Sequence, residues 1–123
     1  MEKRRGTETS RKIDWICRAA SDKKAEEIVI MEMSYRSSFC SFFVVMSAPS
    51  SVRVKAIVDA VEESLERQGQ RLHQKEGYGE GLWVLLDYGE VVVHVFYHQT
   101  RRFYNLERLW GDVPQKIFLD GKE

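Results

Sequence analysis

The sequence is poor in cysteine and has no long apolar run, and these two features exclude several classes of protein. Its two cysteines, Cys17 and Cys40, lie far apart in the chain and lack the close spacing of zinc-binding and redox motifs. We predict that both are small hydrophobic core residues rather than metal ligands or disulfide partners. No stretch approaches the ~18 consecutive apolar residues of a membrane-spanning helix, so we expect no membrane association.

The sequence also lacks the pattern of a secretory signal peptide. Its first ten residues, MEKRRGTETS, are basic and polar, but a signal peptide requires an apolar segment after its basic start. We expect residues 1–10 to form a mobile tail, because they have no apolar side chain to bury after the initiator methionine. A cytoplasmic protein is therefore expected.

An excess of charge of either sign is missing as well. The 19 Lys and Arg residues balance the 19 Asp and Glu residues, so no long-range field attracts nucleic acid or an anionic membrane. We therefore expect a protein partner and no sequence-specific contact with nucleic acid. The 123 residues suit one domain, and a chain of this length buries roughly two-thirds of its unfolded surface.

Apolar periodicity predicts a single α/β domain. The clearest helix has an apolar stripe on one face and charged residues on the other, and it lies between an N-cap at Ser50 or Ser51 and a terminating Gly69. Its stripe is Val54, Ile57, Ala60, Val61 and Leu65, and two further helices are predicted over residues 11–21 and 106–110. The predicted strands cover 27–33, 42–46, 71–75, 83–86 and 91–96. This order predicts a mixed β-sheet flanked by helices, with the domain over residues 11–114 and a C-terminal extension over 115–123.

The aromatic-rich stretch 82–114 supplies the candidate partner-binding residues. Strand alternation places Trp83, Leu85 and Asp87 on one face of a strand, and His94 and Phe96 on one face of the next strand. The segment that closes this stretch contributes Arg102, Tyr104, Asn105, Leu106, Glu107 and Trp110, with Asn105 as the predicted N-cap of the short helix. That helix has more apolar surface than one face can bury. Either the C-terminal segment folds over it or a partner binds it.

Metal and catalytic sites find little support in the sequence. His94 and His98 are four residues apart, a span of ~13 Å in extended chain that is too long to share one zinc ion unless the chain bends before His98. Nucleotidyl transfer needs two or three carboxylates that converge on magnesium, and Asp87 has no second aspartate two residues away. We predict no catalytic residue, no metal and no cofactor. A nucleotide-binding or nucleotidyltransferase-like enzyme is the alternative.

Arginines among the aromatic residues raise the question of RNA binding. Arg101, Arg102 and Arg108 lie close in sequence to Tyr and Trp side chains, a mixture that can stack on unpaired bases. Glu107 and Asp112 interrupt this basic patch, however, and no RNA-binding motif accompanies it. We therefore expect the arginines to serve a protein interface.

Several motifs together resemble one known family. The segments WVLLDYGEVVVHVF and FYNLERLWGD closely resemble the Iojap family, the ribosomal silencing factors, and the upstream segments DKKAEEIVIMEM and VKAIVDAVEESL fit the order of elements in that family. The resemblance covers residues 12–114. It implies a layered fold that is similar in outline to the nucleotidyltransferases but lacks their catalytic site.

The resemblance also implies a partner and a mechanism. A member of this family is expected to bind the large ribosomal subunit through its ribosomal protein fourteen, uL14, where the small subunit docks. It would block subunit joining sterically and repress translation without catalysis or cofactor, and a role in large-subunit assembly is a further expectation. The predicted site residues between Trp83 and Trp110 would form the contact. The same surface could instead form a homodimer.

Overall fold

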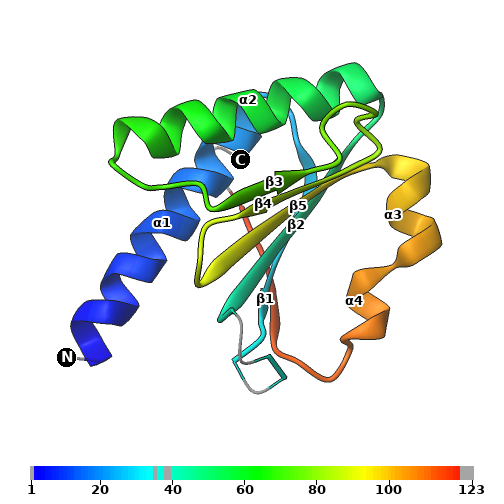
Figure 1. Cartoon of the computed structure of the whole chain (residues 1–123). Helices are drawn as coiled ribbons and strands as arrows, with labels where there is room; N and C mark the ends of the chain where they lie inside the picture. The colour runs from blue at the N-terminus through cyan, green and yellow to red at the C-terminus, as the bar shows by residue number, and fades with distance from the viewer. Residues whose placement is uncertain (1, 35, 38–39, 120–123) are drawn as a thin grey trace.

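The protein is one mixed β-sheet with helices on both faces. The computed structural model describes residues 2–34, 36–37 and 40–119. Its elements are α1 (Glu2–Asp22), β1 (Glu26–Glu32), β2 (Phe42–Ala48), α2 (Ser51–Arg67), β3 (Gln74–Glu76), β4 (Trp83–Asp87), β5 (Val91–Tyr97), α3 (His98–Tyr104), α4 (Leu106–Leu109) and β6 (Gln115–Ile117). Figure 1 shows the long helices α1 and α2 on one side of the sheet and the short helices α3 and α4 on the other. The predicted fold class is confirmed.

The strands follow the order β3-β4-β5-β2-β1-β6 across the sheet. Among the described strands, β2 and β5 form the one parallel pair, and each other neighbouring pair is antiparallel. A parallel pair needs a long connection that crosses over the sheet, and α2 lies within that connection. The two predicted strands of the stretch 82–114 form the antiparallel β4–β5 hairpin, with Leu85 opposite His94.

The main core lies between the sheet and the two long helices. The apolar stripe of α2 is buried at Val54, Ile57, Val61 and Leu65, and Val58 joins it. Helix α2 begins at the predicted N-cap, where the Ser50 side chain accepts a hydrogen bond from the backbone N–H of Arg53. The stripe packs on alternate residues of β4 and β5, including Val84, Leu86, Val91, Val93 and Val95. Apolar side chains spaced at the helical period of 3.6 residues therefore pack in one core against apolar side chains spaced at the strand period of 2.

The N-terminal helix extends further than the sequence predicts. We expected residues 1–10 to form a tail, but α1 begins at Glu2; Met1 lies outside the described residues. This helix contacts the turn between β4 and β5. Lys12 Nζ donates to Tyr88 O and to Glu90 Oε1, each at 3.1 Å, and Thr9 Oγ1 lies 3.4 Å from Glu90 Oε2. Burial alone would raise the pKa of Glu90, but hydrogen bonds from its own backbone and from Lys12 outweigh this effect. The pKa of Glu90 therefore lies below the ordinary carboxyl value.

The C-terminal third contains one helix that was not predicted. The segment after β5, to which no element was assigned, forms helix α3. The C-terminal segment was one candidate cover for the apolar short helix; its β6 pairs with β1 at the far edge of the sheet, while the Gln115 side chain donates to the carbonyl oxygens of Glu107 and Trp110. Residues 120–123 of the predicted extension lie outside the described residues.

The two cysteines differ in burial. Cys17 is fully buried in the main core, as predicted, and burial raises the pKa of its thiol to about 12. Cys40 is only partly buried. It packs against a smaller group of buried side chains on the other face of the sheet, which we call the second cluster: Met31, Met33, Val45, Phe96, Leu106 and Val113. Within the described part of the chain, no helix combines the length and apolarity needed to cross a membrane.

We expect Gly77→Ala to destabilise the fold and Gly79→Ala to leave it unchanged. Gly77 has a φ of +84°, and a Cβ there would lie 2.1 Å from the carbonyl oxygen of Trp83. A Cβ at Gly79 meets no atom of the described neighbouring residues within 4 Å. The free energy of unfolding should fall by about 2 kcal/mol or more for Gly77→Ala and by less than about 0.5 kcal/mol for Gly79→Ala. Urea denaturation measures both, and equal stabilities would contradict the close packing of this turn.

Candidate docking surface

The sheet face opposite α1 and α2 is only partly covered. Helix α4 and the residues after it pack over one region of this face, where Met31, Val45, Phe96, Leu106 and Val113 are buried together. Beyond that region, residues of β2, β4 and β5 that point to the same face stay half-exposed, and Tyr104 of α3 beside them is 49% exposed. We call this surface the open face: Phe43, Trp83, Leu85, Val92 and Tyr104.

A continuous row of aromatic rings crosses the open face. Phe43 lies edge-on to His94, with ring centroids 4.5 Å apart, and the rings of His94 and Trp83 are 6.0 Å apart. Trp83 contacts Tyr104 at 4.7 Å, and Tyr104 contacts Phe103 at 5.0 Å. Each such pair adds stabilisation beyond its buried area. The row therefore joins β2, β5, β4 and α3 into one rigid surface.

His94 is buried within this row and fixes the orientation of the Trp83 ring. It is 4% exposed, and its Nδ1 accepts a hydrogen bond of 3.1 Å from Trp83 Nε1. An acceptor nitrogen carries no proton, so the imidazole is the neutral tautomer protonated at Nε2. Burial supports this state, because it lowers the pKa of His94 to about 4. The prediction that His94 binds a partner is wrong, since its ring is covered.

The remaining predicted site residues fall into three groups. Phe96 and Leu106 are buried in the second cluster, so their assignment to the partner surface is also wrong. Trp83, Leu85, Asp87, Glu107 and Trp110 are half-exposed, and Arg102, Tyr104 and Asn105 are exposed. The structure thus brings Trp83, Leu85 and Tyr104 together on the open face. Trp110 lies at the other end of the second cluster, with the guanidinium of Arg36 5.7 Å from its ring centroid.

Helices α3 and α4 meet at a sharp bend, which we call the elbow (residues 98–109). Asn105 ends α3 with a left-handed backbone, φ +49°, and its side chain accepts a hydrogen bond from the backbone N–H of Arg108. The predicted N-cap is confirmed. Leu109 and Phe103 project from the elbow, 67% and 80% exposed. A shallow hollow of about 500 Å³ is lined by Arg102, Phe103, Tyr104, Asn105, Arg108 and Leu109.

A buried arginine that the sequence did not single out as structural fixes the elbow to the sheet. Arg101 is 6% exposed, and its Nη2 lies 2.6 Å from Glu107 Oε2. Its Nη1 donates to Ser47 Oγ at 3.0 Å and to the carbonyl oxygen of Glu26 at 3.3 Å. Glu107 was predicted to pair with a partner, but it pairs with Arg101. The six-residue spacing gives no helical signal, because the bend at Asn105 alone brings the two side chains together.

The carboxylates and histidines considered for catalysis are already engaged in separate contacts. Asp87 Oδ1 accepts a hydrogen bond of 2.8 Å from the backbone N–H of Gly89, and Glu90 pairs with Lys12. His98 Nε2 lies 2.9 Å from Glu26 Oε1, on a different element from His94. Within the described residues, no three potential metal ligands of the His, Cys, Asp and Glu types converge.

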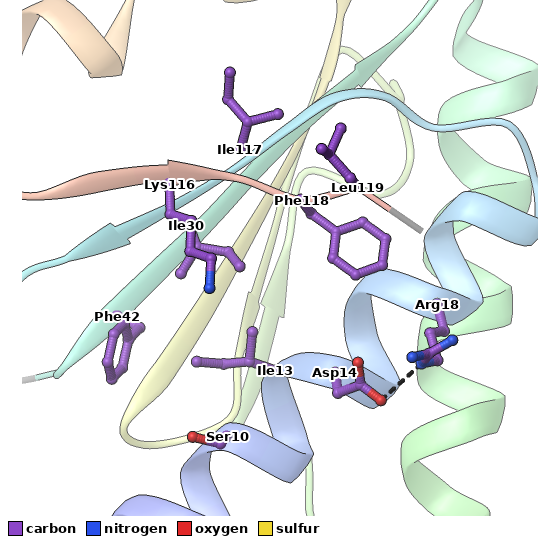
Figure 2. Close-up of a pocket in the computed structure, with 10 residues that line it drawn as sticks. All are labelled: Ser10, Ile13, Asp14, Arg18, Ile30, Phe42, Lys116, Ile117, Phe118 and Leu119. Atoms are coloured by element: carbon purple, nitrogen blue, oxygen red, sulfur yellow. Dashed lines mark hydrogen bonds and ion pairs between the residues drawn. The ribbon is translucent and has the colours of Figure 1, made fainter. Parts of the chain in front are cut away.

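A groove on the opposite face also lacks a convergent acidic site. Figure 2 shows this groove of about 510 Å³ between α1 and the strands β1, β2 and β6. Its lining is mainly apolar, with Ile13, Ile30, Phe42 and Phe118. Asp14 is the one carboxylate among its described lining residues, and its Oδ2 accepts a hydrogen bond of 2.7 Å from Arg18. Nucleotidyl transfer requires at least two carboxylates around one metal, so this groove does not fit the enzyme alternative.

Comparison with known proteins decides the family. Residues 7–123 match the family model described as "Ribosomal silencing factor during starvation". The chain belongs to the ribosomal silencing factor family. The resemblance seen in the sequence is thereby confirmed, and the match extends beyond residues 11–114 at both ends.

Individual relatives of the silencing factor family agree with this assignment. The Ribosomal silencing factor RsfS of Halalkalibacterium halodurans is 43% identical over 96 residues, which are 78% of this chain and 82% of the relative. The chloroplastic Protein Iojap of Zea mays is 33% identical over 101 residues, 80% of this chain and 42% of the maize protein. A crystal structure of a Chromobacterium violaceum protein has a TM-score of 0.81 at 29% identity, covering 93% of this chain and 95% of that one.

The neutral state of His94 predicts a pH dependence of stability. Unfolding returns its pKa from about 4 to about 6.5, so between these values the unfolded chain binds a proton that the folded chain does not. Stability contributed by the neutral ring is complete above pH ~6.5 and is lost as the pH falls toward ~4, by about 2 to 3 kcal/mol.

His94→Gln provides the comparison, because glutamine keeps an acceptor for Trp83 and does not titrate. The free energy of unfolding, measured in urea at several pH values, should fall more steeply for the original chain than for the variant. Loss of the Glu90 contact occurs in both proteins at lower pH, since its pKa is below the ordinary carboxyl value. Parallel pH profiles would contradict the assigned burial of the neutral imidazole.

Proposed function

We propose that this silencing factor binds the large ribosomal subunit through uL14 and prevents the small subunit from joining, which represses translation. The relatives named as ribosomal silencing factors support a role at the ribosome. The observation that carries the proposal is the open face, an aromatic and aliphatic surface that the described helices leave partly exposed. We place this activity in the cytoplasm, and a contribution to large-subunit assembly would use the same contact.

The open face has the chemistry of a protein-binding hot spot. Tyr and Trp are enriched at the energetic centres of protein interfaces, where surrounding contacts exclude water. Trp83 is already fixed by His94, Phe96 and Tyr104, so little side-chain entropy remains to be lost on binding. Asp87, at the end of β4, adds a carboxylate beside the apolar residues. The surface is therefore preorganised to receive apolar side chains of uL14.

A steric mechanism needs only a rigid body of sufficient size. A folded chain of this length has a radius of gyration of about 14 Å, so bound at a subunit interface it would occupy space that the small subunit needs. Lys12, Arg101 and the β2–β5 pair tie the helices and strands into one body. Neither a catalytic residue nor a cofactor takes part in this mechanism.

Co-sedimentation with ribosomal particles tests the proposal. The purified chain should pellet with isolated large subunits and with purified uL14 attached to beads, and it should not pellet with small subunits or with joined ribosomes. Preincubation with large subunits should prevent later joining of small subunits, measured by light scattering. Joining at an unchanged rate by saturated large subunits would contradict the steric mechanism. A homodimer formed through the open face would compete with the subunit, so the amount of bound chain would rise less than proportionally with total chain, and analytical ultracentrifugation would detect the dimer.

Tyr104→Ala should weaken binding to large subunits without unfolding the chain. Tyr104 is exposed and contacts Trp83, so truncation removes an anchor from the open face while most of the core stays intact. We expect a loss of about 2 kcal/mol, which corresponds to a Kd about 30-fold higher. Fluorescence anisotropy with a labelled chain measures the Kd.

Val52→Ala is the matched control, because Val52 is 76% exposed on α2, on the covered side of the sheet. This variant should bind like the original chain. An unchanged Kd for Tyr104→Ala, or an equal loss for Val52→Ala, would place the contact outside the open face.

A further inference from the structure

The elbow carries more uncompensated positive charge than its sequence suggests. In the sequence, Glu107 and Asp112 interrupt a group of arginines and make a nucleic-acid surface look improbable. In the structure both acids are already paired: Glu107 with the buried Arg101, and Asp112 with Arg36 from the other side of the second cluster. Neither carboxylate therefore offsets the arginines that remain on the outside of the elbow.

Two arginines remain exposed at this place. Arg102 and Arg108 are exposed, and neither has an ion pair or hydrogen bond from its side chain to any described residue. Both line the same shallow hollow, together with the exposed rings of Phe103 and Tyr104. A chain with a formal net charge of zero thus places two free guanidinium groups beside two exposed aromatic rings.

We propose that the hollow of the elbow binds the phosphate backbone of ribosomal RNA next to the protein docking site. The proposal rests on the proposed binding to the large subunit. A guanidinium group donates two parallel hydrogen bonds to a phosphate, and exposed rings beside it can stack on an unpaired base. The hollow is open and shallow, which suits a strand that passes over it better than a small molecule that needs enclosure.

The elbow is placed to contact RNA while the open face contacts protein. Tyr104 belongs to both surfaces, since it lines the hollow and stacks on Trp83 at 4.7 Å. Arg101 and Glu107 hold the two short helices of the elbow against β2. Because this link is rigid, docking on uL14 would fix the position of Arg102 and Arg108 relative to neighbouring RNA. The two contacts would then act together, as linked sites do.

The test compares two double variants of the full chain that remove the same charge. Arg102→Gln/Arg108→Gln neutralises the hollow, and Arg11→Gln/Arg71→Gln neutralises two other exposed arginines, on α1 and before β3. Kd for isolated large subunits is measured between about 50 and 200 mM salt at constant magnesium, and Kd for purified uL14 is measured in parallel. Circular dichroism melting confirms that each variant is folded.

We expect the hollow variant to bind large subunits at least about 10-fold more weakly at the lowest salt, with the slope of log K against log salt smaller by about two. Its affinity for purified uL14 should be unchanged, and the control variant should match the original chain throughout. An unchanged Kd and slope for large subunits would overturn the RNA assignment. Equal weakening toward purified uL14 would overturn it too, because the hollow would then hold a carboxylate of the protein. If the original chain itself fails to bind large subunits, the proposed function fails first, and this inference with it.

Discussion

The parallel pairing of β2 with β5 constrains most of the architecture. Seven consecutive residue pairs, from Phe42 opposite Val91 to Ala48 opposite Tyr97, form the centre of the sheet. Parallel neighbours cannot be joined by a tight turn, so the chain crosses the sheet through α2, which packs with α1 on one face (Figure 1). Of the helices in the described chain, only the short α3 and α4 remain for the opposite face. The partial cover that leaves the open face exposed is therefore a consequence of the sheet topology.

Three polar contacts fix the helices and the exposed aromatic residues on this frame. Lys12 fastens α1 to the β4–β5 turn, Arg101 fastens the elbow to β2, and the Trp83 indole is held by His94. Each is substantially shielded from water, and a buried polar group that loses its partner costs more than the bond itself contributes. These contacts therefore specify geometry more than they add stability. They hold the aromatic row and the elbow in the arrangement that a partner would meet.

The sequence predicted the parts of the fold that depend on local periodicity. The stripe of α2 and the alternation of β4 are visible because each repeats within a few residues, and Asn105 was recognised by its capping chemistry. The partners of the site residues were not predictable in this way. Glu107 pairs with Arg101 only because a left-handed residue bends the chain between them. His94 was placed on the correct sheet face, but its burial depends on rings from β2 and β4.

The helical start of α1 escaped prediction for a similar reason. Thr9 and Lys12 are buried against Glu90, a residue more than seventy positions away in the chain. Strand β6 has no apolar alternation in the sequence, because its three residues are all exposed. It forms because the edge of β1 offers free backbone groups to pair with. Burial that arises from distant contacts leaves no periodic pattern in the sequence. Exposure of the candidate site residues could accordingly be judged only from the fold.

A cryo-EM reconstruction of the chain bound to isolated large subunits would show directly which surface of the chain meets the ribosome. We expect Trp83, Leu85 and Tyr104 to face uL14, with α1 and α2 pointing away from the subunit. The elbow hollow should then lie against ribosomal RNA. A reconstruction in which α1, α2 or the groove beside β6 contacts the subunit, with the open face turned to solvent, would contradict docking through the open face.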